Sequence, residues 1–233
     1  MDLDWDGCVN AREVSGLRPG SVVRMESPHR LTGAGWEQAR KYGLRTLVDL
    51  RNDDEYDSVE RPGWVRTIRI PLEPVGTPFF EHWTAIDGLA SPLSYPAMLT
   101  EYGSRVLSVI STIIDAPPGA VAVHCSAGRD RTGLVSLVLQ TVAGLSVAEI
   151  SADHHLSLER LQPWYDELGI VNQVTRMAEF LGTHDTTHAE AIAAAVAAAR
   201  LLRIPEDQLH RLRVRLLPAP DAGSPPAPAH TPG

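Results

Sequence analysis

Hydrophobic and polar positions along the chain follow two periods, which predict strands alternating with helices in the first half. Residues 45–50 and 120–124 are short, branched and apolar, as in strands that are buried on both faces of a sheet. Residues 66–70 alternate polar and apolar side chains, which is typical of a less central strand. Residues 97–114 place apolar side chains at three- and four-residue spacing and predict an amphipathic helix.

Capping signals mark where further helices begin and end. Thr32 is expected to cap a helix that runs to about Tyr42 and stops at Gly43. Ser146 and Glu149 form a capping-box pair before an apolar stretch. The second half of the chain carries mostly helical signals, with further helices predicted at 170–181, 188–202 and 205–216.

The order of these elements predicts an α/β fold, with a central, mostly parallel sheet flanked by helices and a helix-rich C-terminal half. Residues 74–96 have no clear period and contain several prolines, so we expect a long loop or lid there. Residues 218–233 are rich in proline and alanine and are expected to be a disordered tail. The chain of 233 residues is then one domain over residues 1–217, followed by that tail.

Composition narrows the class of protein. The hydrophobic fraction of 43% and the charged fraction of 21% are those of a soluble globular protein. A net charge of −8 argues against a protein that coats nucleic acid or adsorbs broadly to membranes. No apolar run approaches the roughly 20 residues that span a bilayer, and the N-terminus lacks an apolar signal core. Two cysteines are too few for a disulfide framework, so we expect a protein of the reducing cytoplasm. The sequence leaves open the oligomeric state and secretion without a signal peptide.

The chemistry is concentrated in one turn, VHCSAGRDRTG at residues 123–133, between an apolar strand and an apolar helix. A loop in that place gathers backbone N–H groups at a helix N-terminus, where they can bind an anion. Ser126, Ala127 and Gly128 are small, so the backbone can approach that anion closely. Cys125 lies at the base of the loop, where the same positive field favours the thiolate form and makes it a candidate nucleophile.

Arg131 follows Cys125 by six positions, so its guanidinium returns across the mouth of the loop. Its parallel N–H donors match two phosphoryl oxygens and can stabilise them during transfer. Thr132 Oγ1 is expected to donate to the sulfur as it leaves, and His124 to fix the loop through backbone hydrogen bonds. The residues expected to bind the phosphate are Ser126, Ala127, Gly128, Arg129, Asp130, Arg131 and Thr132.

The spacing Cys-x5-Arg, with His before it and Thr-Gly after it, resembles the signature of the cysteine-based protein tyrosine phosphatases. The form HCSAGRDRTG is similar to an atypical bacterial branch with HCxxGKDRTG, which acts on phosphotyrosine and sometimes on phosphoserine, phosphothreonine or phosphoinositides. Residues 10–13, 48–55 and 152–157 are also similar to that branch. The resemblance implies the phosphatase fold, a phosphocysteine intermediate without metal or cofactor, and phosphorylated protein or phosphoinositide substrates. Arg129 stands where the branch usually has lysine.

The leaving oxygen needs a proton donor. In most tyrosine phosphatases an aspartate of a separate upstream loop serves, and Asp87 has a suitable separation from Cys125. In the atypical branch the aspartate beside the signature arginine has been assigned this role, and it corresponds to Asp130. We favour Asp130 and keep Asp87 as the alternative.

Two other functions use the same features. One is a phosphate-binding module without turnover, which the presence of both Cys125 and Arg131 disfavours. The other is a sulfurtransferase of the rhodanese type, which the arginine at six residues and the following Thr-Gly fit less well.

Other chemical groups receive simpler interpretations. Asp49 and Arg51 are expected to form a structural ion pair, and His184 and His188 to be surface residues because no third metal ligand is near. His154 and His155 are expected to serve helix packing and the surface. Cys8 is interpreted as an ordinary thiol, with a redox partnership with Cys125 as the alternative.

Overall fold

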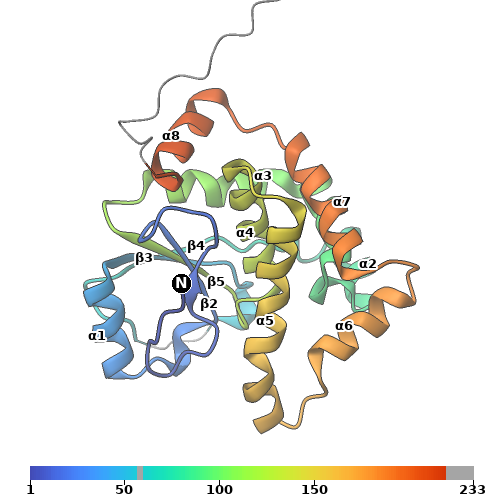
Figure 1. Ribbon diagram of the computed structural model, residues 1–233, viewed down its shortest axis with the longest axis horizontal. Helices are drawn as coiled ribbons and strands as arrows, with labels where there is room; N and C mark the ends of the chain where they lie inside the picture. The colour runs from blue at the N-terminus through green and yellow to red at the C-terminus, as the bar shows by residue number, and fades with distance from the viewer. Residues whose placement is uncertain (57–59, 219–233) are drawn as a thin grey trace, which may run out of the picture.

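The computed structural model describes residues 1–56 and 60–218, so all but the first residue of the predicted disordered tail lies outside the described residues (Figure 1). Its centre is a five-stranded sheet in the order β1-β2-β5-β3-β4. The strand bounds are β1 (Arg12–Glu13), β2 (Val22–Met25), β3 (Leu44–Asp49), β4 (Arg66–Arg69) and β5 (Ala120–His124). Only β1 pairs antiparallel, with β2, and the other neighbours are parallel. The predicted α/β fold with a mostly parallel sheet is confirmed.

The central strand β5 explains why its sequence is apolar throughout. It pairs with β2 and β3 in parallel, and all five of its residues are buried. Ala122 packs with the core on one face of the sheet, whereas Val121 and Val123 pack with the core on the other. The edge strand β4 keeps partly exposed residues, as its alternating pattern predicts.

Helices cover both faces of the sheet (Figure 1). The first face is covered by α1 (Gly33–Tyr42), whose Trp36 and Ala39 join Leu47 in the core. Thr32 caps this helix through the N–H of Gly35, and Gly43 ends it at a φ of 102°, as predicted. The opposite face carries α3 (Tyr95–Asp115) and α4 (Asp130–Ala143), and α7 (His188–Leu201) packs against these two helices in the larger core.

The expectation of a loop or lid over residues 74–96 is wrong. This segment contains α2 (Pro78–Ala85) and two short 3₁₀ helices, Gly88–Ala90 and Pro92–Ser94. Its prolines do not break these elements, because Pro78 and Pro92 stand in the first turn, where a missing N–H costs no hydrogen bond.

The C-terminal half is helical, as predicted. After α3 (Tyr95–Asp115), the helices have the bounds α4 (Asp130–Ala143), α5 (Val147–Glu167), α6 (Gln173–Gly182), α7 (His188–Leu201) and α8 (Glu206–Leu216). Ser146 and Glu149 form both hydrogen bonds of the capping box at the start of α5. Helix α7 packs against α3, α4 and α5.

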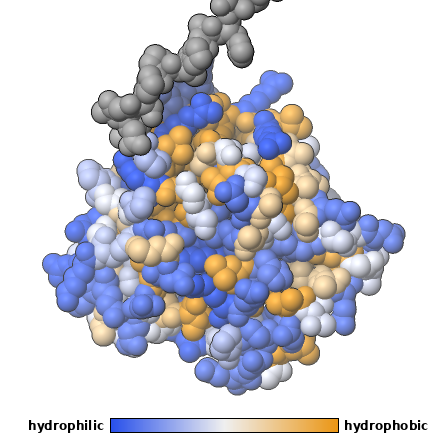
Figure 2. All heavy atoms as spheres, viewed as in Figure 1, coloured by the Kyte–Doolittle hydropathy of each residue, from blue (hydrophilic) through white to orange (hydrophobic). Residues whose placement is uncertain are grey.

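The molecular surface has a mixed character. On the face shown in Figure 2, hydrophilic residues predominate and hydrophobic residues lie in small groups between them. Among the described residues, none of the helices combines the length and the apolar character that crossing a bilayer requires. The buried apolar side chains of the described residues gather in two cores beside the sheet and in a smaller cluster around Leu158, Met177 and Leu181.

Candidate active site

The loop between β5 and α4 joins the carboxyl end of the central strand to a helix N-terminus. Cys125 follows β5 directly and is only 2% exposed, at the base of the loop. Gly128 has a φ of 68°, and a Cβ atom there would lie 2.2 Å from the carbonyl oxygen of Met25. Only glycine combines this conformation with this closeness to the neighbouring strand.

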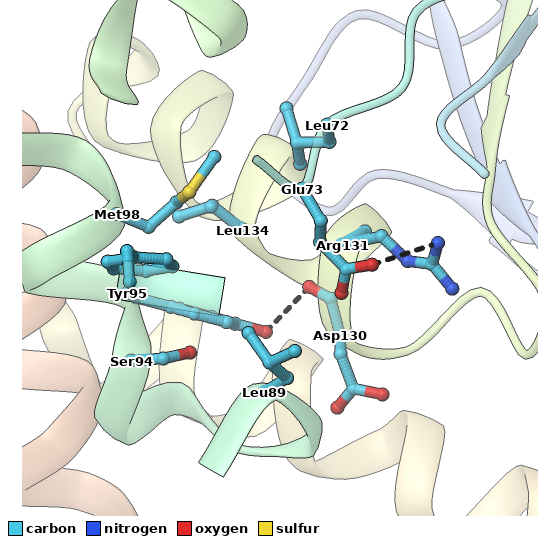
Figure 3. Close-up of a pocket in the computed structure, with 10 residues that line it drawn as sticks. Leu72, Glu73, Leu89, Ser94, Tyr95, Met98, Asp130, Arg131 and Leu134 are labelled. Carbon is cyan, nitrogen blue, oxygen red and sulfur yellow. Dashed lines mark hydrogen bonds and ion pairs between the residues drawn. The ribbon is translucent and has the colours of Figure 1, made fainter. Parts of the chain in front are cut away.

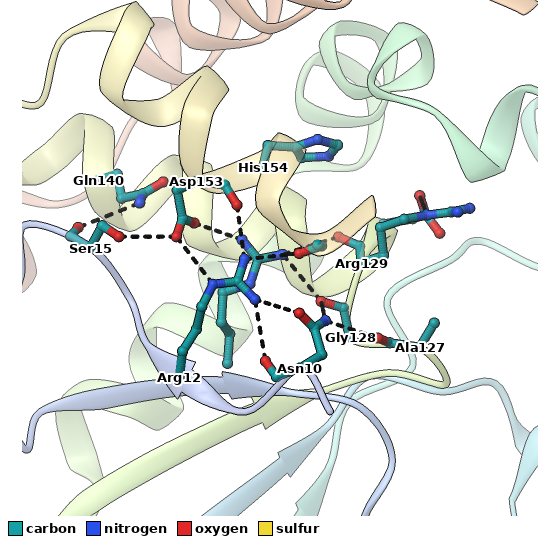
Figure 4. Close-up of polar contacts among 12 residues, drawn as sticks. Asn10, Arg12, Ser15, Ala127, Gly128, Arg129, Gln140, Asp153 and His154 are labelled. Atoms are coloured by element: carbon teal, nitrogen blue, oxygen red, sulfur yellow. Dashed lines mark hydrogen bonds and ion pairs between the residues drawn. The ribbon is translucent and has the colours of Figure 1, made fainter. Parts of the chain in front are cut away.

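The loop is held from behind through its carbonyl groups (Figure 4). Asn10 Nδ2 donates to the carbonyl oxygens of Ala127 at 3.1 Å and Gly128 at 3.2 Å, and Arg24 Nη2 donates to that of Gly128 at 3.1 Å. In a trans peptide the N–H points opposite to the C=O. The N–H groups of Gly128 and Arg129 therefore point away from this network, as an anion-binding loop requires.

Two buried arginines and one carboxylate form the centre of that network. Asp153 Oδ2 lies 2.7 Å from Arg24 Nη1, and Asp153 Oδ1 lies 3.4 Å from Arg12 Nε. Burial and the neighbouring Arg24 lower the pKa of Arg12 to about 9. Burial alone would raise the pKa of Asp153, but Arg24 and Arg12 hold it below its ordinary value. At neutral pH the three groups carry one net positive charge behind the loop.

Arg131 reaches the mouth of the loop, where it meets Glu55 and Glu73, of which Figure 3 shows Glu73. Glu55 binds both Nη atoms of the guanidinium, with a distance of 2.7 Å between Oε1 and Nη2, and it also accepts from Ser126 Oγ at 2.7 Å. Glu73 Oε2 lies 3.3 Å from Arg131 Nη1. Burial would raise the pKa of Glu55, but the hydrogen bonds from Arg131 and Ser126 lower it to about 2.

Burial has the opposite outcome at Glu73, because it raises the pKa of this carboxyl against the attraction of Arg131. The sequence prediction missed the roles of both glutamates. Glu55 lies at the end of the stretch 48–55 that resembles the bacterial branch, so one signal for it was present.

Asp130 begins α4 beside Arg131 and Glu73, and lines with them a small pocket that is open to solvent (Figure 3). Its side chain is 19% exposed, and Oδ1 accepts from Arg129 Nε at 2.9 Å. The guanidinium of Arg129 continues outward, donating to Gln173 Oε1 at 2.9 Å and to the Ala90 carbonyl at 3.4 Å. The Arg129 side chain thus anchors the loop to α6, and its backbone N–H is the part available to an anion.

Asp87 lies elsewhere. It has a left-handed φ of 59°, its side chain is 60% exposed, and it pairs with Arg176 of α6. It lines a second pocket together with Arg129 and Gln173, which does not include Arg131 or Asp130. Of the two candidate acids, the structure brings only Asp130 into the pocket of Arg131.

Known proteins include relatives of this chain. Residues 3–203 match the model of the tyrosine phosphatase family. The chain belongs to that family. It is 30% identical over 179 residues to a Cupriavidus necator protein named "Putative tyrosine-protein phosphatase", covering 68% of this chain and 64% of that protein. A "Tyrosine-protein phosphatase" of Nostoc commune is 29% identical over 148 residues, covering 61% of this chain and 50% of that protein. The aligned part therefore spans less than two thirds of either relative.

His124 and Thr132, two further residues of the stretch 123–133, are both buried. His124 is fully buried, and Nδ1 lies 3.1 Å from the Cys125 carbonyl oxygen. Burial lowers the pKa of His124 to about 4 against the attraction of Asp49, so the ring is neutral at pH 7. Thr132 Oγ1 is buried and has no hydrogen-bond partner within the described residues, so its hydroxyl is unengaged.

The remaining predictions have mixed outcomes. Asp49 and Arg51 form the expected ion pair, at 2.8 Å. Both thiols, Cys8 and Cys125, are free, and burial raises the pKa of Cys8 far above its ordinary value. Within the described parts of the chain, His, Cys, Asp and Glu side chains form no group of three or more that could hold a metal ion.

His184 is exposed, as expected of a surface residue, whereas His188 is half-buried. Its Nε2 lies 2.9 Å from Nδ1 of the buried His154. The contact joins α7 to α5 and involves residues 34 positions apart, which a spacing of four along one helix does not predict.

Proposed function

We propose that this protein is a phosphomonoester hydrolase that acts on phosphotyrosine through a phosphocysteine intermediate. The observation that carries the proposal is the position of Cys125 at the base of a loop whose carbonyls are bound from behind, with Arg131 across its mouth. Such a loop offers N–H donors and a bidentate guanidinium to a phosphoryl group directly above the sulfur.

In the first step, the Cys125 thiolate attacks phosphorus and the bond from phosphorus to the leaving oxygen breaks. Asp130 supplies the proton that this oxygen takes up. In the second step, the Asp130 carboxylate accepts a proton from water as the water oxygen attacks phosphorus. The phosphorus–sulfur bond breaks, and Thr132 Oγ1, which has no other partner, donates to the departing sulfur.

The pocket beside Asp130 supports a preference for an aromatic leaving group. Its lining is largely apolar, and the side chains that form this part are Leu72, Phe79, Leu89, Met98 and Leu134. These apolar side chains would shield a bound phenol ring from water, while the phenol oxygen stays near Asp130. Similarity to the HCxxGKDRTG branch supports phosphoserine, phosphothreonine and phosphoinositides as further substrates of the same site.

Residues 1–217 are the proposed catalytic domain, since the family model covers residues 3–203 and α8 packs back onto α3 and α4. The two free thiols fit a reducing compartment such as the cytoplasm.

The test is hydrolysis of a panel of phosphotyrosine, phosphoserine, phosphothreonine and phosphoinositide substrates with EDTA present. We expect phosphate release from the phosphotyrosine peptide, and none from Cys125→Ser, which should still bind inorganic phosphate because the loop is intact. Acid quenching of wild type during turnover should trap phosphate on Cys125. Phosphate binding without any release would identify a binding module instead, and thiosulfate-dependent transfer of sulfur would identify a sulfurtransferase.

A further inference from the structure

A chain of hydrogen bonds connects α5, α7 and α3 to the end of the catalytic loop. Ser151 Oγ lies 3.3 Å from His188 Nδ1, and His188 Nε2 lies 2.9 Å from His154 Nδ1. His154 Nε2 lies 3.0 Å from the hydroxyl of Tyr95, which donates to the carbonyl oxygen of Asp130 at 2.7 Å. His154 and Tyr95 are each only 2% exposed.

The number of available protons allows only one direction of donation along this hydrogen-bond chain. The Asp130 carbonyl oxygen can only accept a hydrogen bond, so the single proton of the Tyr95 hydroxyl is donated to it, and the hydroxyl oxygen must accept from His154. His154 therefore carries its proton on Nε2 and accepts at Nδ1 from the Nε2–H of His188. His188 in turn accepts at Nδ1 from Ser151. The Asp130 carbonyl at the end of the hydrogen-bond chain thus determines which atom donates at every step.

The surroundings keep His154 neutral, as this direction requires. Burial lowers the pKa of His154 well below its ordinary value, and His188 from α7 lowers it further. The arginines that face it do the same, and they come from β2, the catalytic loop and β1, respectively Arg24, Arg129 and Arg12. Tyr95 from α3 and Asp130 from α4 are the other titratable residues of this hydrogen-bond chain, and the ring of His155 on α5 meets that of His188 edge to face.

The position of Gly133 shows independently that His154 and Tyr95 pack closely against the start of α4. A Cβ atom at Gly133 would lie 2.9 Å from His154 Cδ2 and 3.0 Å from the Tyr95 hydroxyl. Any larger residue there would force the His154 ring or the Tyr95 hydroxyl to shift. Gly133, which ends the stretch 123–133, thus leaves space for the side chains of His154 and Tyr95.

We propose that Tyr95, His154 and His188 are positioning residues that fix the Asp130 carbonyl and, through it, the Asp130–Arg131 peptide plane. This inference rests on the proposed function for its effect on turnover. Asp130 is the first residue of α4, so a shift of its backbone moves both the proposed acid and the guanidinium that follows it. Tyr95 also lines the pocket of Arg131, but its hydroxyl donates to the Asp130 carbonyl, so its action on the loop is through the backbone of Asp130.

The test compares Tyr95→Phe with Tyr102→Phe, a control on the same helix whose hydroxyl has no hydrogen bond to the loop. The Arg131 amide shares its peptide with the Asp130 carbonyl, so its ¹⁵N resonance should move in Tyr95→Phe and stay in Tyr102→Phe. The kcat of Tyr95→Phe for phosphotyrosine should fall about tenfold, the worth of one hydrogen bond, with KM nearly unchanged. The fall should be smaller for an ester of a very acidic phenol.

A second pair of variants tests the direction of the chain. Gln places an N–H donor near the position of His Nε2, so His154→Gln should retain several-fold more activity than His154→Leu. The ¹⁵N spectrum of the wild-type imidazoles should show His154 protonated at Nε2 alone. Protonation at Nδ1, an unmoved Arg131 amide in Tyr95→Phe, or equal losses in Gln and Leu variants would overturn the proposal. The two NMR measurements decide it even if no phosphomonoester is hydrolysed.

Discussion

Glu55 holds Arg131 with both oxygens of its carboxylate, from a 3₁₀ helix that follows β3 and lies 76 positions earlier in the chain. The same carboxylate accepts from Ser126 of the loop, so one side chain ties the arginine to the loop it serves. The pair leaves the guanidinium oriented before a substrate arrives.

Glu55→Gln should lower kcat/KM for phosphotyrosine about tenfold, because Arg131 loses the charged partner that orients it. Steady-state kinetics on a phosphotyrosine peptide measures the effect. Glu101→Gln, on the exposed side of α3, is the matched control and should behave as wild type. A gain in kcat/KM with tighter inhibition by phosphate would show that Glu55 competes with the substrate instead.

The lowered pKa of Glu55 also predicts how stability depends on pH. A carboxyl whose pKa falls from 4.5 to about 2 on folding stabilises the protein above about pH 4.5, and loses this contribution as the pH falls toward 2. Glu55→Gln does not titrate, so the stability gap between wild type and variant should shrink over that range. Urea unfolding at a series of acidic pH values measures it. A gap that is constant with pH would contradict the lowered pKa.

Arg24→Met should both unfold more easily and bind phosphate less well. Its removal leaves Asp153 buried with one cation fewer and the Gly128 carbonyl with Asn10 as its donor, at a cost of about 3 kcal/mol in the free energy of unfolding. Arg40→Met is the control, since its pair with Glu37 is exposed and contributes less than about 0.5 kcal/mol. Urea unfolding and phosphate titration in the Cys125→Ser background measure the two effects. Equal stability of the two variants would contradict the role of Arg24.

Arg131→Lys should lose activity about a hundredfold, the usual cost of removing a donor from the transition state. A lysine ammonium cannot span two phosphoryl oxygens or both oxygens of Glu55. The measurement is kcat/KM for phosphotyrosine, with folding checked by circular dichroism. An unchanged kcat/KM would remove Arg131 from the proposed mechanism.

Local signals in the sequence predicted much of the fold. Thr32 and Gly43 bound α1 because capping depends only on residues within one turn, and Ala120–His124 reads as a strand because both of its faces are buried. Strand β2 was missed because it carries Arg24, a charge that is stabilised by Asp153, 129 positions away. No local pattern reports such a partner.

The site divides in the same way. Cys125, Asp130 and Arg131 lie within one short stretch, so their spacing predicts that they meet. Glu55 and Glu73 follow β3 and β4, and they join the loop after β5 only because these three strands pair in parallel and end at one edge of the sheet. The hydrogen-bond chain through His154 depends on how the helices pack, so residue spacing along the sequence could not predict it either.

Asp130→Asn tests the choice of the acid against Asp87→Asn. If Asp130 protonates the leaving oxygen, its loss should slow hydrolysis of phosphotyrosine far more than that of an ester whose phenol is very acidic, because only the former needs the proton. The basic limb of the pH–rate profile should flatten as well, since deprotonation of the acid produces that limb. Asp87→Asn should show neither effect, because Asp87 pairs with Arg176 outside the pocket of Arg131.

The opposite result would make Asp87 the acid: the loss in Asp87→Asn would depend on the leaving group, and Asp130→Asn would slow hydrolysis of both esters equally. Asp130 would then be the residue that orients Arg129, to which its carboxylate is bound.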